Sequence, residues 1–566
     1  MNRSDVTERP GANLLLSYTP KLLTVLREGY GLRAFRADVV AGMTVAIVAL
    51  PLSMAIAIAS GATPAQGLYT SIFGGLLVSA LGGSRFQIGG PAGAFIILVA
   101  ATVAQHGMDG LILATALSGL LLTLVGVLQL GSFVQFVPFP VTVGFTAGIA
   151  IIIFASQIKD LLGLSLANEP GELIGKLSAL YSARGSFSPA ALGLACVTIA
   201  VILILRRWRP HWPGMLIAIA VAALAAAVLN LPVATIGTRF GGIPSTLPQP
   251  ALPDLSPAKI LAILPAALSF TLLGAIESLL SAVVADGMTG RRHRSNCELV
   301  AQGLANVGSA LFGGFCVTGT VARTATNVRA GAYGPVAGIL HALFLLLFIL
   351  VAAPLAAFIP LAALAGVLAV VAWNMIDRAA IRILARSGLG ESIVLAATFL
   401  LTLFRDLIEA IVVGIALGGV IFIHRIVRAT SVESSRASGD SVETAEGDLP
   451  PDDILIYRIN GPIFFGATGS IGSALDRIHD SQSALVLDLA GVPVLDATGS
   501  NMIADLARKT GKQGVALWVA GANPAVRRSL LLHGLRAPLC RYASTVEQAI
   551  ARQRDANEAA SEPAHG

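Results

Sequence analysis

The chain has 566 residues, of which 55% are hydrophobic and 12% are charged, and its mean hydropathy is +0.78. Soluble domains carry about 25% charged residues, so this composition excludes an ordinary soluble protein and indicates a helical membrane protein rather than a β-barrel. The formal net charge of +6 fits basic cytoplasmic loops and does not indicate nucleic-acid binding.

The sequence contains no motif for a metal, a cofactor or a catalytic centre. Its four cysteines, Cys196, Cys297, Cys316 and Cys540, lack metal-ligand spacing, and we expect them to pack as small apolar side chains. There is also no Ser/His/Asp arrangement and no nucleotide-binding loop. We therefore expect no metal site, no cofactor and no enzymatic activity.

Apolar spans follow a short polar N-terminal region. Residues 1–35 lack an apolar run followed by a cleavage site, so we expect a cytosolic segment rather than a cleaved signal peptide. Residues 36–428 form the expected transmembrane domain. Its fourteen expected spans are residues 38–60, 65–81, 88–105, 110–130, 138–158, 188–205, 212–230, 260–285, 298–313, 317–328, 335–353, 359–376, 391–405 and 407–424. An even number of spans places both termini on one side.

Basic residues are concentrated in every second loop. If the N-terminus is cytoplasmic, the inside loops contain Arg85, Arg206, Arg207, Arg209, Arg291, Arg292, Arg294, Arg378, Arg382, Arg386, Arg425 and Arg428. The opposite loops contain fewer basic residues. This asymmetry predicts an inner (plasma) membrane protein whose two termini are cytoplasmic.

Two glycine-rich segments differ from simple spanning helices. They are residues 87–104, which begin QIGGPAGAF, and residues 313–335, GGFCVTGTVARTATNVRAGAYGP. Broken helices are tolerated where the backbone lines a cavity or is buried in protein, and a corresponding pair in two halves indicates a transporter's central site. Pro91 follows Pro51 by 40 residues and Thr318 follows Glu277 by 41, so the positions correspond. A coincidental pair of glycine-rich helix ends is the alternative.

The two broken segments predict an anion site. The N-terminus of a half-helix exposes unpaired N–H groups and carries partial positive charge, which suits an oxyanion at mid-membrane. The expected donors are Gly93, Ala94 and Phe95 on one side and Thr318, Gly319 and Thr320 on the other. Arg323 would strengthen the positive field. Alternatively, Arg323 pairs with a local carboxylate or with a helix C-terminus.

Glu277 is the only ionisable residue in residues 260–285. A carboxylate at the centre of a membrane helix costs about 2.5–3.5 kcal/mol on insertion scales, and such residues usually mark an ion, proton or substrate pathway. Ser281 lies four residues later on the same helix face, and Gly274 leaves room for another backbone. We expect Glu277 and Ser281 to hold the coupling ion, a proton or sodium. A protonated Glu277 that bonds to a neighbouring helix is the alternative.

The chemistry of the chain changes after Arg428. Residues 429–452 are polar, acidic and rich in serine, so we expect a mobile linker. Residues 453–556 alternate the short apolar runs ILIYRI, ALVLDL and VALWVA with helical stretches near 468–479, 498–509, 523–533 and 545–554. This alternation predicts a small α/β domain, and we expect residues 557–566 to be a disordered tail.

Motifs from about residue 35 to residue 555 resemble the sulfate permease (SulP) family of anion transporters. The most specific are GLYTSIFGGLLVSALGGSRFQIGGPAGAF (67–95), LGAIESLLSAVVADGMTG (273–290), VTGTVARTATNVRAGA (317–332) and, in the tail, VPVLDATG (492–499). Within the family the chain looks most similar to bacterial members that carry C4-dicarboxylates.

The resemblance implies an α-helical polytopic membrane protein with seven plus seven inverted helices. A core would move against a gate in an elevator-like manner, with a cytosolic STAS domain at the C-terminus. The binding site would lie between the third and tenth spans, and the family's coupling position falls on Glu277. Leu52 replaces the Gln of many sulfate-carrying members, which leaves bicarbonate or a dicarboxylate such as succinate or fumarate open. Ser53, which follows it, completes the expected substrate-binding set.

The leading functional hypothesis is a proton-coupled secondary anion transporter, because bicarbonate carriers of the family use Asp, not Glu, for sodium. A sodium-coupled or uncoupled carrier or channel is the second hypothesis. A sensor or scaffold that signals through the STAS domain is the third. The resemblance further implies a homodimer, and the STAS domain could recruit a cytosolic protein. Thr498 matches the phosphorylated Ser of bacterial anti-sigma antagonists, although a helix N-cap is its simpler role.

Overall fold

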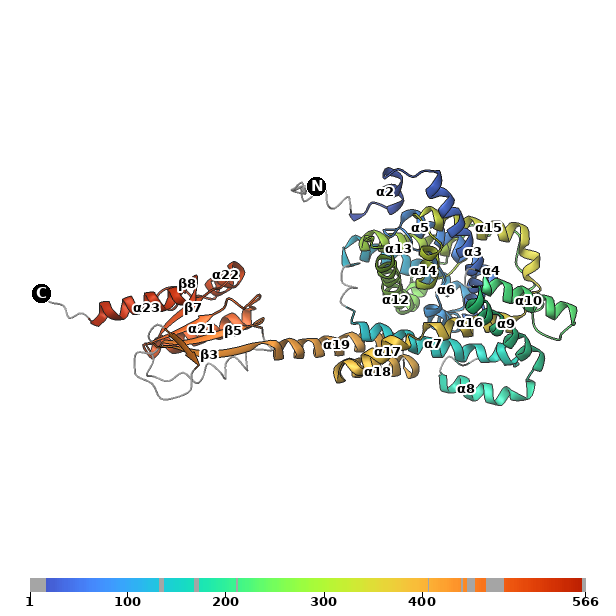
Figure 1. Cartoon of the computed structure of the whole chain (residues 1–566). Coiled ribbons are helices and arrows are strands. Elements are labelled where there is room, and N and C mark those ends of the chain that lie inside the picture. The colour runs from blue at the N-terminus through green and yellow to red at the C-terminus, as the bar shows by residue number, and fades with distance from the viewer. Residues whose placement is uncertain are drawn as a thin grey trace. The chain divides into compact units, whose positions relative to one another are not determined.

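The computed structural model describes residues 17–131, 137–166, 170, 173–209, 212–405, 407–438, 441–444, 454–464 and 483–561. The chain divides into two compact units, Met1–Ile415 and Ala416–Gly566, and each is described by itself. The first unit consists almost entirely of helices, whereas the second contains a mixed sheet with helices (Figure 1). Helix α19 (Leu407–Ala429) runs from the first unit into the second.

The first half of the helical unit starts with α2 (Lys21–Arg27) and the long α3 (Leu32–Ala59). The elements that follow are α4 (Pro64–Tyr69), η1 (Thr70–Gly74), α5 (Gly75–Leu81), β1 (Gly89–Gly90), η2 (Gly93–Phe95), α6 (Ile96–Val127), α7 (Phe139–Leu162), α8 (Leu173–Ser182), η4 (Ala183–Ser186), α9 (Pro189–Trp208), α10 (Gly214–Val228) and α11 (Ile236–Phe240). Helix α6 overlaps two expected spans, 88–105 and 110–130. It is divided between them at Gly107, where the backbone leaves the helical conformation (φ is 70°).

The second half repeats a similar order. Its elements are α12 (Pro257–Thr289), α13 (Ser295–Leu311), β2 (Thr318–Gly319), α14 (Val321–Arg329), α15 (Val336–Ala356), α16 (Leu361–Met375), α17 (Arg378–Ser387), α18 (Leu389–Phe404) and α19. Among the described residues, eight helices are long and apolar enough to cross a membrane, and α10 and α18 are shorter apolar helices. Helices α2, α8, α11 and α17 were not expected, because each is too short or too polar for a hydropathy pattern to find.

Carboxylates hold the loops beside both broken segments. Asp38 of α3 is buried and accepts hydrogen bonds from the backbone N–H groups of Tyr333 (2.6 Å) and Gly334 (3.0 Å), in the loop after α14. Glu298 of α13 is also buried and accepts one from the N–H of Ser84 (3.0 Å), in the loop before β1. Each half of the helical unit therefore supplies a carboxylate that fixes a loop of the other half.

Helices α6 and α13 approach closely at glycine. A Cβ atom on Gly303 would lie 2.2 Å from Thr123 Oγ1 and 2.5 Å from the carbonyl oxygen of Gly119. Small residues allow helix backbones to pack in this way inside a membrane protein. Because α6 starts at one of the broken segments, this contact helps to fix the position of its N-terminus.

The second unit contains a sheet with strand order β4-β3-β5-β6-β7-β8. Its parallel strands are β5 (Ile454–Asn460), β6 (Ala484–Asp488), β7 (Ala516–Ala520) and β8 (Arg541–Ala543). Alternate residues of β5 face opposite sides. Leu455 and Tyr457 pack in the core with α21 (Ala497–Lys512) and α22 (Pro524–Leu532), whereas Ile454 and Ile456 pack against α23 (Val546–Ser561).

These elements confirm the three predicted strands and three of the four predicted helices. The helix expected near 468–479 lies outside the described residues. The structure differs from the expected linker, because β3 (Ser431–Ser438) and β4 (Ser441–Thr444) form the antiparallel edge of the sheet. A polar segment can pair here because an edge strand needs backbone hydrogen bonds more than apolar side chains. Helix α23 also extends to Ser561, into the expected tail.

The close approach of α6 and α13 predicts that Gly303→Ala destabilises the helical unit. The added methyl group would overlap backbone and hydroxyl atoms, and overpacking typically costs about 1–3 kcal/mol. Thermal unfolding of the purified protein in detergent should therefore occur several degrees lower. Gly193→Ala in α9 is the matched control, because no atom lies within 4 Å of its added Cβ. Equal melting temperatures for both variants would contradict this packing.

Candidate anion-binding and coupling site

The two broken segments meet inside the helical unit. Strands β1 and β2 pair in antiparallel fashion, with Gly89 opposite Gly319 and Gly90 opposite Thr318. The chain then enters η2 and α6 on one side and α14 on the other. Two helix N-termini therefore start beside the same short bridge. This arrangement places the partial positive charges of both helices close to one point.

The free N–H groups differ in part from the expected set. In the described chain, the N–H groups of Gly93 and Ala94 have no hydrogen-bond partner, as predicted, but that of Phe95 donates to the Ala92 carbonyl oxygen (3.1 Å). Thr320 is also unsuitable as a backbone donor, because its N–H donates to the Ile88 carbonyl oxygen (3.1 Å). Thr320 is the N-cap residue of α14, so the free donors on this side belong to its first turn.

That first turn contains Val321, Ala322 and Arg323, whose N–H groups have no acceptor within the residues described. Val321 and Ala322 are not among the predicted donors, because the sequence predicts this span from residue 317, whereas α14 begins at Val321. The side chain of Thr318 has a different role from the expected one. It is buried, and its Oγ1 donates to the carbonyl oxygen of Gly274 in α12 (3.4 Å). Thr318 therefore ties the bridge to the helix that carries Glu277.

Arg323 is buried at the centre of the bridge. Its guanidinium donates to Ser71 Oγ (3.1 Å), Ser53 Oγ (3.1 Å) and the Pro91 carbonyl oxygen (3.3 Å). The Nε atom has no partner. No carboxylate forms an ion pair with Arg323 in the part of the chain that the structure describes.

Both alternative roles of Arg323 are therefore unsupported, since it lies in the first turn of α14 and not at a helix C-terminus. A buried cation is stable only if negative charge or hydrogen-bond acceptors surround it. Here the acceptors are neutral. The positive charge of Arg323 is therefore not neutralised by any of these partners.

Glycine keeps the bridge open to the guanidinium. A Cβ atom on Gly90 would lie 2.0 Å from one Arg323 nitrogen, and a Cβ on Gly319 would lie 1.4 Å from Gln87 Nε2. At Gly93 the nearest atoms to such a Cβ are Ile153 Cδ1 of α7 (3.3 Å) and Met375 Sδ of α16 (3.8 Å). Apolar side chains from two other helices thus form a wall beside the N-terminus of α6. Sequence alone could not reveal this wall, because the three residues are far apart in the chain.

Glu277 lies on the face of α12 that contacts the bridge. Gly274, three residues earlier, accepts from Thr318, and Ser281, four residues later, donates to Thr324 Oγ1 (3.0 Å). Glu277 is partly exposed, and its carboxyl group forms no hydrogen bond or ion pair with another described residue. A carboxyl group with a packing role would have such a partner. Its free acceptor oxygens can take up a proton or a cation.

Polar side chains connect α12 to both broken segments. The Ser281–Thr324 bond continues to the other segment, because Thr324 Oγ1 also accepts the N–H of Ile88 (3.1 Å). One turn away, Gln87 Nε2 donates to the Ser278 carbonyl oxygen (3.1 Å). These contacts are the route by which a change at Glu277 could reach the bridge. The sequence analysis did not find Gln87 and Thr324 as site residues, although both lie within the quoted motifs.

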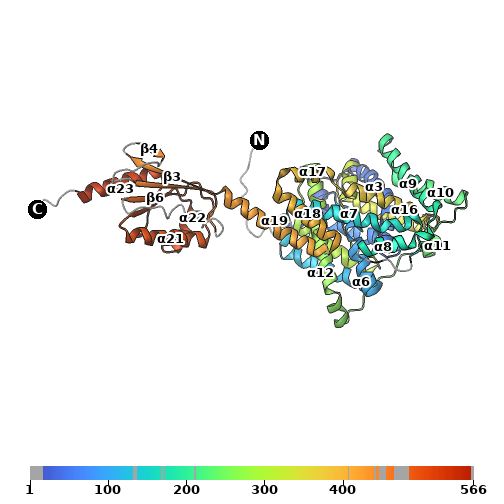
Figure 2. The same ribbon diagram turned by 90° about the horizontal axis from the view of Figure 1, so that it is seen from below.

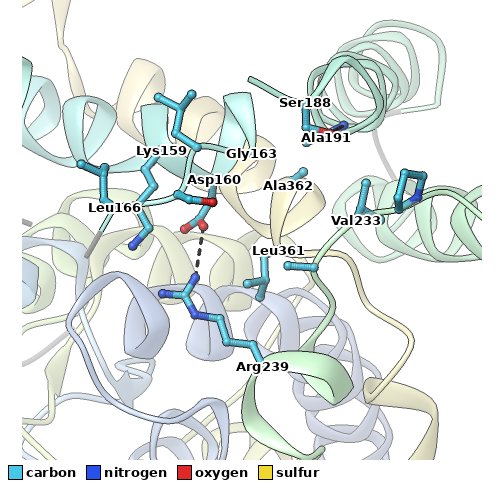
Figure 3. Close-up of a pocket in the computed structure, with 14 residues that line it drawn as sticks. Lys159, Asp160, Gly163, Leu166, Ser188, Ala191, Val233, Arg239, Leu361 and Ala362 are labelled. Carbon is cyan, nitrogen blue, oxygen red and sulfur yellow. Dashed lines mark hydrogen bonds and ion pairs between the residues drawn. The ribbon is translucent and has the colours of Figure 1, made fainter. Parts of the chain in front are cut away.

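A cavity of about 670 Å³ borders the first half of α6 and reaches Ile96, the residue that follows η2. Its basic lining residues are Lys159, Lys176, Arg239 and Arg405. A second cavity of about 610 Å³ lies near the C-terminus of α7. Figure 3 shows Arg239 facing Asp160 in this second cavity, where the two side chains approach to 3.3 Å. None of the expected substrate-binding residues lines either cavity, but the first comes nearer to the bridge because it reaches Ile96.

Thr498 lies in the second unit, in the first turn of α21. It is exposed and is not the N-cap residue, so the simpler role expected for it is wrong. Asp496 caps the helix instead, and its carboxylate accepts the N–H of Gly499 (2.7 Å). An aspartate two residues before Thr498 can serve as the cap because its side chain reaches the free N–H groups of the first turn.

A polytopic helical unit with two broken helices around a buried, unpaired cation is typical of a membrane transporter for anions. Comparison with known proteins agrees. Residues 35–398 match the sulfate permease family, and residues 450–549 match the STAS domain. The chain therefore belongs to the sulfate permease family. It is a multi-pass membrane protein and a secondary anion transporter, not an enzyme.

The chain is 38% identical over 510 residues to the "Putative sulfate transporter YvdB" of Bacillus subtilis (strain 168), covering 90% of this chain and 95% of that protein. The transmembrane domain of the bicarbonate transporter BicA from a cyanobacterium is 31% identical, with a TM-score of 0.60, and covers 67% of this chain and 98% of that one. The fold also matches the murine anion transporter Slc26a9, with a TM-score of 0.85, 17% identity, and coverage of 98% and 96%. These relatives are named for sulfate, bicarbonate or anions, so the expected similarity to dicarboxylate carriers has no support.

The geometry at Arg323 predicts that Arg323→Gln weakens anion binding by at least about tenfold while the protein still folds. Gln retains donors for Ser53 and Ser71 but removes the charge that attracts the anion. The affinity is measured by titrating the purified protein with sulfate and with bicarbonate. Arg329→Gln, at the exposed C-terminal end of the same helix, is the matched control and should bind normally. Equal anion affinities for the two variants would contradict the role of Arg323.

Proposed function

We propose that this protein carries a small inorganic oxyanion, sulfate or bicarbonate, together with a proton. The observation that carries the proposal is the buried guanidinium of Arg323, which has only neutral partners in the described structure and lies beside two helix N-termini. An oxyanion can accept hydrogen bonds from a guanidinium and from backbone N–H groups at the same time. Of the expected substrate-binding residues, Gly93, Ala94 and Ser53 belong to the proposed site, and Val321 and Ala322 are added to it.

The names of the relatives favour an inorganic oxyanion over a dicarboxylate. Ile153 and Met375 approach the N-terminus of α6 and form an apolar side of the site next to Gly93. The named relatives transport, or are named for transporting, sulfate and bicarbonate. Leu52 stands where many sulfate carriers have Gln, so bicarbonate is retained as a candidate substrate beside sulfate. A C4-dicarboxylate remains the alternative substrate.

Glu277 is the proposed coupling residue, with Ser281 beside it. Its carboxyl group lacks a protein partner in the described structure and shares a helix face with the contacts to Thr318 and Thr324. Burial in a membrane domain favours a neutral carboxyl group, so protonation is the natural way to stabilise Glu277 during transport. Sodium coupling and uncoupled anion flow are the alternatives, and imposed gradients distinguish them.

The remaining features of the proposal concern the whole transporter. Seven plus seven inverted helices would form a core and a gate that move past each other like an elevator, with both termini cytoplasmic. The broken segments of the two halves correspond in position, which supports an inverted repeat. The protein would act as a homodimer. The exposed Thr498 is a candidate for phosphorylation, through which the STAS domain could recruit a cytosolic protein.

Glu277→Gln should abolish accumulation driven by an inward proton gradient but preserve exchange of labelled for unlabelled anion. Gln mimics the protonated carboxyl group and therefore keeps the site neutral, but it cannot release a proton. Proteoliposomes are loaded with unlabelled sulfate or bicarbonate for exchange, and proton and sodium gradients are imposed separately for accumulation. We expect the proton-driven component to fall by at least about tenfold, with exchange within about twofold of the unmodified protein.

The control is Glu409→Gln, which removes an exposed carboxylate of the same domain without touching the bridge. It should accumulate the anion normally. Proton-driven accumulation that persists in Glu277→Gln would contradict the coupling role. Faster exchange of succinate than of sulfate or bicarbonate in the unmodified protein would favour the dicarboxylate alternative. Anion binding without any flux would favour a sensor or scaffold.

A further inference from the structure

Helix α17 is a short amphipathic helix between two apolar helices, α16 and α18. The carboxylate of Asp377 caps its N-terminus by accepting the N–H of Ala380 (2.9 Å). Three arginines, Arg378, Arg382 and Arg386, follow at intervals of four residues and therefore form one row along the helix. Helix α17 alone, with ten residues, is too short to span a membrane, and its row of arginines favours a position at the membrane surface.

One side of α17 is fixed to the transport domain. Ala380 and Leu384 are buried and pack with Val143 of α7 and Leu395 of α18. With 3.6 residues per turn, these two positions lie on the opposite side of the helix from the arginine row. The row therefore points away from the protein. Its three guanidinium groups are exposed, and none forms an ion pair with a carboxylate in the described chain.

The C-terminal end of α9 brings three more arginines to the same place. Arg206 donates to the side-chain oxygen of Asn374 (2.7 Å), which lies in the last turn of α16, just before α17. Arg207 and Arg209 follow and are exposed. We call the six residues Arg206, Arg207, Arg209, Arg378, Arg382 and Arg386 the basic face. Helix α17 lies at the upper edge of the helical unit in Figure 2.

Large apolar side chains are exposed beside the basic face. Trp373 is 62% exposed, with the Arg378 guanidinium 3.9 Å from the centre of its ring, and Leu389, just after α17, is 80% exposed. Ile383 on α17, Trp208 at the end of α9 and Trp212 just after α9 are exposed as well. Tryptophan and arginine at a membrane surface typically place their apolar parts among acyl chains and their polar parts among headgroups. If these arginines only set the orientation of the chain in the membrane, they would not need to form a row on one helix face. They would also not need large exposed apolar side chains beside them.

We propose that the basic face binds the headgroups of anionic phospholipids and that Trp373, Ile383 and Leu389 contact the acyl chains beneath them. The guanidinium groups match the phosphate in charge and hydrogen-bond geometry, and the exposed apolar side chains match the adjoining part of the bilayer. Because α17 packs on α7, whose Ile153 adjoins the anion site, bound lipid would stabilise a helix that borders this site. This inference goes beyond the proposed function and holds for any transported anion.

The tryptophans of the chain provide the test. Of its four tryptophans, Trp208, Trp212 and Trp373 adjoin the basic face, whereas Trp518 is buried in the sheet of the second unit. The full-length protein is reconstituted in phosphatidylcholine vesicles that contain a small fraction of brominated phosphatidylglycerol or, separately, brominated phosphatidylcholine. Bromine quenches tryptophan on contact. We expect brominated phosphatidylglycerol to quench the tryptophans at a mole fraction about fivefold lower than that needed with brominated phosphatidylcholine. The reason is that each basic residue near an anionic surface adds substantial affinity.

Two variants with equal loss of charge complete the design. Arg378→Gln/Arg382→Gln/Arg386→Gln should lose the preference for phosphatidylglycerol, while quenching by brominated phosphatidylcholine stays and shows that the variant is inserted. The control, Arg27→Gln/Arg291→Gln/Arg292→Gln, removes three exposed arginines elsewhere and should keep the preference. Salt at about 0.5 M should also reduce the preference in the unmodified protein. Equal quenching by the two lipids, or a preference that survives in the first variant, would overturn the proposal.

Discussion

The structure of the transport domain depends on one buried charge. Arg323 lies where two helix N-termini meet, and the hydroxyl groups of Ser53 and Ser71 accept its hydrogen bonds without neutralising it. Both helix N-termini add positive charge to that of the guanidinium, so binding of the proposed anion would be favourable here. A carboxylate partner would make the protein more stable without substrate but would compete with the transported anion.

The bridge between the broken segments and the region around Glu277 are held by contacts of different strength. Asp38 and Glu298 each hold a loop of the opposite half, so the two broken segments cannot separate independently. Around Glu277 the contacts are weaker hydroxyl bonds, such as that between Ser281 and Thr324. If Glu277 takes up a proton as proposed, that proton would act on a region of weaker contacts next to a more strongly held bridge. This division would suit the proposed carrier, which moves its site as one body.

Local patterns in the sequence predicted much of this structure. The lengths of apolar runs predicted a helical membrane domain, short apolar runs predicted β5, β6 and β7, and glycine clusters predicted the two broken segments. The predictions that failed depend on contacts between residues that are far apart in the sequence. The N–H of Thr320 is not free, because it donates to the carbonyl oxygen of Ile88, more than 200 residues away. Ile153 and Met375 lie beside Gly93 although they belong to other helices. Helix α17 and strand β3 were missed because their stability comes from packing and edge pairing rather than from their own composition.

The most direct test of the account is to locate the bound anion. Selenate resembles sulfate and scatters anomalously, so crystals of the protein grown with selenate should show one strong anomalous peak beside Arg323. We expect the peak within about 4 Å of the guanidinium and in hydrogen-bond range of the N–H groups of Gly93 and Val321. A peak elsewhere, for example beside Arg239, with none between the two helix N-termini, would contradict the central role of this bridge.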